Sequence, residues 1–293
     1  MRMNLRTMLG CAAVVWLSLS GCAAKQGVEK GGAEGSSNAG SETRREELGG
    51  LTEKEFQALH ELKAEAAPPR KGQMLEIAGA RAYLSLPENA RKPVPGVLVI
   101  HEWWGLNEHI MHWADRLAAQ GYAALAVDLY GGKVATTPEE AMAIMKTVDP
   151  ARSQAILKTA HQYLMTSSRV QATHTGVVGW CFGGAWSLRA GMAIPELNAV
   201  VMYYGRPVLN VDELRSIKAP VLAIFGTKDE SIPNDVVEEF DEALSDAGVA
   251  HRILKYDAPH AFANPSAPGR YNAEAAEAAW EQVKGFLAEN LKQ

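Results

Sequence analysis

The chain has 293 residues, of which 47% are hydrophobic and 22% are charged, and its formal net charge is −5. A chain of this length and apolar content can bury a large core in one α/β domain or in two small domains. It has neither the basic excess of many nucleic-acid-binding proteins nor the acidic block of a solvating tail. Composition therefore favours an enzyme or a binding protein for small molecules and argues against nucleic acid as a partner.

The first 21 residues have the pattern of a secretory signal peptide. Arg2 and Arg6 precede the apolar run LGCAAVVWLSL at residues 9–19, which is too short to form a stable transmembrane helix. The run leads into LSGC at residues 19–22, which resembles the bacterial lipobox, in which the cysteine is acylated and becomes the mature N-terminus. We therefore predict a lipid anchor at Cys22; an ordinary signal peptide with an incidental cysteine is the alternative.

The predicted anchor places the protein in the bacterial cell envelope. Ala23, next to the lipidated cysteine, favours the outer membrane, with the domain facing the periplasm. Residues 22–50 are rich in Gly, Ser and charged side chains, so they are predicted to form a flexible tether. Residues 51–70 are expected to form a short helix and a linker, because TEKE at residues 52–55 fits a capping box and an apolar stripe follows it.

From residue 71 to residue 293, apolar segments of strand length alternate with helical segments. We expect strands at residues 96–100, 122–127, 175–178, 199–204 and 220–225, and another near residues 252–256. We expect helices at residues 107–120, 138–146, 151–167 and 272–291. Several strands are apolar on both faces, so the pattern predicts a single α/β domain with a doubly wound, mostly parallel sheet. In such sheets, functional sites form at the carboxyl ends of the strands.

The segment GWCFGG at residues 179–184 follows one of these strands. It fits the G-x-nucleophile-x-G turn between a strand and a helix, with cysteine in the place of the nucleophile. Cys11 falls in the predicted signal peptide and Cys22 carries the predicted lipid, so Cys181 has no disulfide partner in the folded domain. A buried, inert cysteine is the alternative, but it would not need glycines on both sides.

An acid and a histidine follow this cysteine, each after a later strand. Asp229 lies in GTKDESIP, and His260 lies in DAPHAF. A thiolate is the attacking form, an imidazole takes its proton and later activates water, and a carboxylate fixes the tautomer of the imidazole. The order Cys, Asp, His therefore predicts the triad of an α/β-hydrolase. Asp229 as a turn residue and His260 as a capping or core residue are the alternatives.

Attack on a carbonyl also needs two hydrogen-bond donors for the oxyanion. The backbone N–H of Phe182 lies at the predicted turn, and the backbone N–H of Trp103, in the loop HEWWG, is expected to be the second donor. The same loop starts like the zinc-protease motif H-E-x-x-H, but its fifth residue is Gly105, so the match fails. The sequence implies no cofactor and no metal.

Together, HEWWG, DLYGG, GWCFGG, GTKDESIP and HAFANP resemble the dienelactone hydrolase family of α/β-hydrolases over residues 71–293. The resemblance implies an α/β-hydrolase fold, with Cys181, Asp229 and His260 as the triad. It also implies that Glu102 holds or releases the thiol proton according to whether substrate is bound. A carboxylate that only accepts hydrogen bonds from loop N–H groups is the alternative for Glu102.

Two positions depart from that family. Dienelactone hydrolases place a serine and an arginine after the histidine, where this chain has Ala261 and Asn264. Because the arginine grips the substrate carboxylate, the hydrolysis of true dienelactones is left open. A pocket for an apolar or aromatic group is expected instead, lined by Trp104, Tyr130, Trp180 and Phe262.

The nucleophile also restricts the substrate. A thiolate leaves a tetrahedral intermediate more readily than an alkoxide does, so a plain alkyl ester would mostly revert, whereas an enol lactone, aryl ester or thioester would go forward. We therefore predict hydrolysis of a small lactone or activated ester through a thioester intermediate. A lipoprotein that binds a small hydrophobic molecule on the same fold, with the triad idle, is the alternative. The oligomeric state is not predicted.

Overall fold

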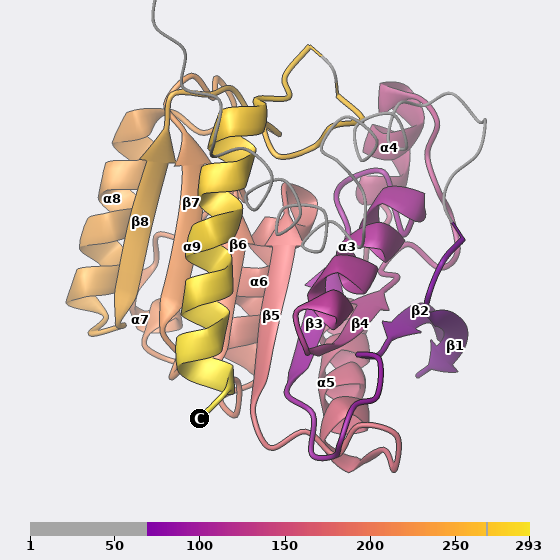
Figure 1. Ribbon diagram of the computed structural model, residues 1–293. Coiled ribbons are helices and arrows are strands. Elements are labelled where there is room, and N and C mark those ends of the chain that lie inside the picture. Colours follow the sequence, from indigo (N-terminus) through magenta and orange to yellow (C-terminus); the bar gives the residue numbers. More distant parts are fainter. Residues whose placement is uncertain (1–68, 268) are drawn as a thin grey trace, which may run out of the picture. The chain divides into compact units, whose positions relative to one another are not determined.

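Eight strands form one sheet in the computed structural model, which describes residues 69–267 and 269–293 (Figure 1). Their order across the sheet is β1-β2-β4-β3-β5-β6-β7-β8. Strand β2 is antiparallel to both of its neighbours, and the strands from β4 to β8 in that order run parallel. The predicted doubly wound, mostly parallel sheet is therefore confirmed. The strands are β1 (Gln73–Ile77), β2 (Ala80–Ser85), β3 (Gly96–Ile100), β4 (Ala123–Val127), β5 (Thr175–Trp180), β6 (Ala199–Tyr203), β7 (Val221–Gly226) and β8 (His251–Tyr256).

Helices cover both faces of this sheet. Helices α3 (Glu108–Ala119) and α9 (Ala273–Leu291) pack on one face. Helices α5 (Pro150–Thr166), α6 (Phe182–Ala193) and α8 (Asn234–Asp246) pack on the other, and Figure 1 shows α9 in front of the sheet with α6 behind it. The shorter helices α4 (Pro138–Met145) and α7 (Val211–Leu214) lie within connections.

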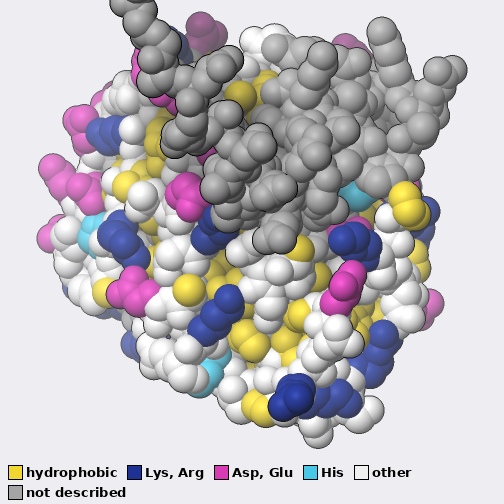
Figure 2. All heavy atoms as spheres, viewed as in Figure 1, with side chains coloured by type: hydrophobic (Ala, Val, Ile, Leu, Met, Phe, Trp, Pro, Cys, Tyr) yellow, Lys and Arg dark blue, Asp and Glu magenta, His cyan; other side chains and the backbone are white. Residues whose placement is uncertain are grey.

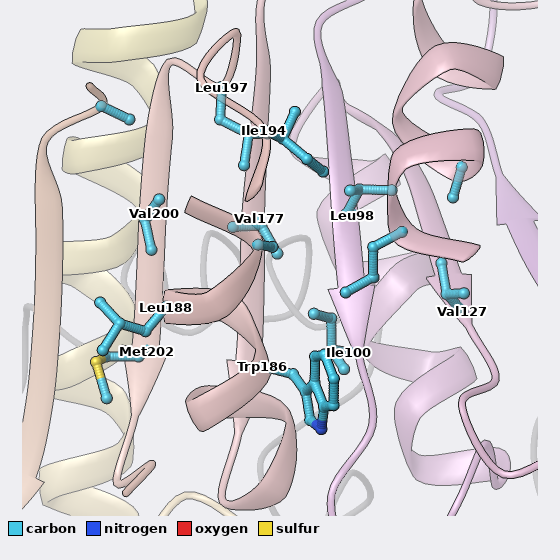
Figure 3. Packing of buried hydrophobic residues seen from close by; sticks show 14 of the residues in the cluster. Leu98, Ile100, Val127, Val177, Trp186, Leu188, Ile194, Leu197, Val200 and Met202 are labelled. Atoms are coloured by element: carbon cyan, nitrogen blue, oxygen red, sulfur yellow. The ribbon is translucent and has the colours of Figure 1, made fainter. Parts of the chain in front are cut away.

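The core consists of two apolar layers, one on each face of the sheet. Strand β3 contributes to both, because Val97 and Val99 point into one layer while Leu98 and Ile100 point into the other. All four side chains are fully buried. Figure 3 shows the layer that contains Leu98 and Ile100, which α6 covers with residues such as Leu188. Burial on both faces explains why the central strands are continuous apolar runs rather than alternating ones.

The first two strands were not expected from the sequence. Strands β1 and β2 form a hairpin whose turn residues, Ala78 and Gly79, have φ values of 54° and 70°. An Asn-Gly or Asp-Gly pair would have signalled such a turn, and Ala-Gly does not. Strand β1 is also partly exposed at the edge of the sheet, so its pattern is neither fully apolar nor regularly alternating.

Several predictions concern residues outside the described ranges. The signal peptide, the lipid at Cys22, the tether at residues 22–50 and the helix within residues 51–70 stay predictions. None of the described helices combines the length and the apolar character that crossing a lipid bilayer requires. On the described surface visible in Figure 2, basic and acidic side chains are interspersed, in keeping with the balanced composition.

Candidate active site

Cys181 stands in a tight turn at the carboxyl end of β5, directly before α6 begins at Phe182. Its backbone has φ 53° and ψ −115°, a region that costs a non-glycine residue of order 1–3 kcal/mol. The turn is possible because glycines surround it: a Cβ atom at Gly179 would overlap the carbonyl oxygen of Gly183, and one at Gly183 would overlap that of Ile100. The chain therefore holds the cysteine in a strained turn above the edge of the sheet, with its side chain half-buried.

The Cys181 sulfur lies next to two backbone donors and one carboxylate. The N–H groups of Phe182 and Trp103 lower the pKa of the thiol, although neither contact has the strict geometry of a hydrogen bond. Burial, and after it the charge of Glu102, act in the opposite direction and raise this pKa to about 12. The thiol is therefore protonated at neutral pH.

Glu102 follows β3 and is 3% exposed. Burial raises the pKa of its carboxyl to about 7, while a hydrogen bond from Asn264 and the charge of Arg270 lower it. The side-chain amide of Asn264 donates to Oε2 of Glu102. The Tyr204 hydroxyl also lowers the pKa of Glu102, although its contact falls short of a regular hydrogen bond. A buried carboxyl thus sits beside the thiol and changes charge near neutral pH.

His260 and Asp229 meet at the same end of the sheet. The ring Nδ1 of His260 is 2.6 Å from Oδ2 of Asp229, which is fully buried. The other carboxylate oxygen of Asp229 accepts from the backbone N–H groups of Ser231 at 2.8 Å and Ile232 at 3.1 Å. These bonds hold the carboxylate in place, and the carboxylate holds the ring with its proton on Nδ1. Within the described ranges, no hydrogen bond joins His260 to Cys181.

One cavity of about 670 Å³ brings these groups together, since Glu102, Cys181 and His260 all line it. Its apolar wall comes from three tryptophans and from the segment around α4, and it includes Trp103, Trp104, Trp186, Met142, Met145 and Val148. Three arginines also line it, namely Arg189, Arg206 and Arg270. Arg206 and Arg270 form no ion pair with any described carboxylate, so the cavity offers positive charge as well as apolar surface.

The predicted pocket residues are only partly right. Trp104 lines the cavity, but Tyr130, Trp180 and Phe262 do not. Trp180 is stacked on Trp113, with ring centroids 4.8 Å apart, because the last position of β5 faces α3. Phe262 is fully buried against Tyr204, and Tyr130 is 5% exposed with its ring edge against His101.

The sequence analysis missed the residues that complete the cavity. The arginines come from α6, from the loop after β6 and from the loop before α9, and none of them belongs to a recognisable motif. Asn264, noted only as the place of a missing arginine, instead donates to Glu102. Arg206 and Arg270 could have been found as the basic residues in the loops near the carboxyl ends of the strands. The described residues include no group of three or more His, Cys, Asp or Glu side chains that could hold a metal ion.

Comparisons with known proteins show the family of the chain. A model of the dienelactone hydrolase family matches residues 80–291. The chain belongs to the dienelactone hydrolase family. This membership makes it a hydrolase of α/β-hydrolase type, and it confirms the resemblance seen in the sequence motifs.

The similarity to individual relatives covers nearly the whole length of each relative. Protein usf from Aquifex pyrophilus is 33% identical over 232 residues, which cover 75% of this chain and 99% of that protein. A “Putative carboxymethylenebutenolidase” from Synechocystis sp. is 34% identical over 241 residues, covering 75% of this chain and 94% of that one. The crystal structure of a “Putative Dienelactone Hydrolase” from Klebsiella pneumoniae is 31% identical, with a TM-score of 0.66, and covers 71% of this chain and 92% of its own.

Proposed function

We propose that the chain hydrolyses a small ester or lactone by nucleophilic attack of Cys181, through a thioester acyl-enzyme. One observation carries the proposal: Cys181, His260 and Glu102 line one cavity, and His260 is bonded to the buried Asp229. The family and its relatives named for carboxymethylenebutenolidase activity agree with a carboxylic ester as the substrate class.

The reaction starts from the protonated thiol. When substrate occupies the cavity, the thiol proton leaves to a base in reach, His260 or Glu102, and the sulfur bonds to the carbonyl carbon. The carbonyl oxygen becomes an oxyanion beside the N–H groups of Phe182 and Trp103. Collapse of this intermediate breaks the bond to the leaving oxygen, which takes the proton from the residue that accepted it from the thiol, His260 or Glu102.

The second half of the reaction releases the acid. His260 takes a proton from water, and the resulting hydroxide attacks the thioester carbonyl. The thiolate then leaves and regains a proton, so the enzyme returns to its resting state. Asp229 does not exchange the proton; it orients the ring and stabilises the imidazolium whenever His260 holds the proton.

Glu102 keeps the resting thiol inactive. Its negative charge is the second cause, after burial, of the raised pKa of Cys181. Bound substrate can move Glu102 away from the sulfur, or Glu102 can be neutralised when it accepts the thiol proton. In either case the reactive thiolate forms only when a substrate is present to be attacked. This arrangement protects the sulfur from oxidants and alkylating agents between turnovers.

The cavity favours a substrate with two kinds of surface. The wall around Trp104, Trp186 and Met142 suits an apolar or aromatic group. Arg206 and Arg270, which form no ion pair with a carboxylate among the described residues, suit a negative charge. We therefore propose an activated ester or lactone with an aromatic or unsaturated body and an acidic group. The lipid anchor predicted at Cys22 would hold this activity in the cell envelope, facing the periplasm.

A panel of esters tests the proposal. Purified protein should hydrolyse aryl esters and enol lactones much faster than ethyl esters of the same acid, and Cys181→Ala should abolish this activity. His161→Phe serves as the folding control, because His161 is buried but does not line the cavity. Binding of the panel without turnover by the wild type would favour the alternative, a lipoprotein that only binds a small hydrophobic ligand.

A further inference from the structure

His101, at the end of β3, is fully buried and has no part in the reaction as described so far. Its Nδ1 lies 2.6 Å from the backbone carbonyl oxygen of Glu102, and the backbone N–H of Leu129 donates to its Nε2 at 3.1 Å. Because Nε2 accepts a hydrogen bond, the proton of the neutral ring is on Nδ1. The Nδ1–H group therefore donates to the Glu102 carbonyl.

That carbonyl belongs to the same peptide unit as the N–H of Trp103. A trans peptide is planar, and its C=O and N–H point in opposite directions. A donor that fixes the carbonyl therefore also fixes the direction of the N–H, which here points towards the Cys181 sulfur. A hydrogen bond to the carbonyl also polarises the peptide, which makes its N–H a stronger donor. The N–H of Gly105 adds a second, longer bond to this carbonyl at 3.2 Å.

The other oxyanion donor is held in a different way. The Phe182 N–H shares its peptide unit with the Cys181 carbonyl, which accepts from the N–H of Ala185 at 3.1 Å in the first turn of α6. A helix thus holds one donor, whereas a side chain and a short turn hold the other. The His101 ring itself cannot rotate freely, because it is stacked on Phe182 with centroids 5.5 Å apart and meets Tyr130 edge-on.

We propose that His101 is a positioning residue for the hydrolytic reaction: through its Nδ1–H it orients the Glu102–Trp103 peptide so that the Trp103 N–H stabilises the oxyanion. The inference rests on the proposed function. Burial lowers the pKa of His101, so the ring is uncharged at neutral pH. The Asp128 carboxylate is 3.9 Å from Nε2 and accepts from the N–H groups of Tyr130 and Gly132.

Two substitutions separate the hydrogen bonds of the ring from its volume. His101→Phe keeps a flat ring against Phe182 but removes both hydrogen bonds. His101→Asn loses the ring, but its amide nitrogen stands close to the position of Nδ1 and can still donate to the Glu102 carbonyl. His161→Phe is the matched control, because His161 is also a buried histidine, with Nε2 2.9 Å from the Thr175 hydroxyl, and it does not line the cavity.

Three measurements on each variant distinguish oxyanion stabilisation from general damage. The first is the kcat and KM for an aryl ester. The second is the affinity for a trifluoromethyl ketone, whose adduct with Cys181 carries an oxyanion. The third is the rate of alkylation of Cys181 by iodoacetamide, which forms no oxyanion.

For His101→Phe we expect kcat and ketone affinity to fall together by roughly 10- to 100-fold, somewhat less than the loss of a whole oxyanion donor. KM should stay within about threefold of the wild type, and His101→Asn should recover most of the lost kcat. The alkylation rate should fall much less than kcat, because the Trp103 N–H is one of the smaller influences on the thiol pKa. The His161→Phe control should change none of the three measurements by more than about threefold. Parallel losses in all three measurements for His101→Phe, or no loss in kcat, would overturn the inference.

The role of His101 can be tested even if the wild type lacks esterase activity or if His101→Phe does not fold. If the wild type does not hydrolyse esters, the proposed function fails, while the ketone affinities still test the role of His101. If His101→Phe does not fold, ¹⁵N NMR of the wild-type ring decides. We expect a proton on Nδ1 and none on Nε2 at neutral pH. A ring protonated on Nε2 at neutral pH would contradict the inference without any measurement of turnover.

Discussion

Replacing Glu102 by glutamine should stabilise the protein relative to the wild type at pH 8. The difference in unfolding free energy between variant and wild type should be much smaller at pH 5. The pKa of the buried carboxyl is raised from 4.5 to about 7, so between these values the folded state binds a proton that the unfolded state does not. The stability associated with this proton is fully present below pH 4.5 and is lost as the pH rises through about 7. A shift of this size corresponds to about 3 kcal/mol at pH 8.

The glutamine has no charge to bury at either pH, so its stability does not follow this curve. We expect the difference in unfolding free energy between the variant and the wild type to grow by about 2–3 kcal/mol from pH 5 to pH 8. Any fixed cost of the new amide is the same at both values and cancels from this comparison. Urea unfolding at the two pH values measures it, with the exposed Glu88→Gln as the control that should show no such change. An equal effect of Glu102→Gln at both pH values would refute the argument that burial controls this carboxyl.

Four further predictions follow from the site. Alkylation of wild-type Cys181 by iodoacetamide should rise about tenfold per pH unit without a plateau near pH 8.5, and mass spectrometry of samples quenched over time gives the rates. Asp229→Asn should lower kcat by roughly 10²- to 10⁴-fold in ester hydrolysis, because His260 loses the partner that fixes its tautomer. Gly183→Ala should lower the urea unfolding free energy by about 1–3 kcal/mol, whereas Gly285→Ala, where a Cβ atom meets nothing within 4 Å, should leave it unchanged or raise it by up to about 1 kcal/mol. Replacing Arg206 and Arg270 together by glutamine should raise KM about tenfold for an acidic aryl ester and leave that for its neutral analogue unchanged.

The sequence was most informative where a single local rule decides the structure. Central strands such as β3 are apolar on both faces, and a run of that kind has few other structural solutions. The turn at Cys181 could be expected for a similar reason, because the glycines on either side of it indicate close backbone contacts. The hairpin of β1 and β2 was missed since its turn lacks a recognisable residue pair.

The cavity was harder to predict because it depends on which loops meet in space. Trp180 and Trp104 look alike as candidate pocket residues, yet Trp180 is the last residue of β5 and points into the core. The link between Asn264 and Glu102 joins positions 162 residues apart, and no local pattern indicates such a contact. His101 was likewise noticeable in the sequence only as the first residue of HEWWG, which begins like a zinc-protease motif but does not complete it.

The account depends most on Cys181 as the nucleophile, and the acyl-enzyme itself is the direct test. Protein mixed with an aryl ester, quenched in acid within milliseconds to seconds and digested should give a peptide containing Cys181 that carries the acyl mass. Hydroxylamine at neutral pH should remove this mass, as expected of a thioester. An acyl group found on another residue, or turnover without any acylated Cys181 peptide and undiminished in Cys181→Ala, would contradict the account.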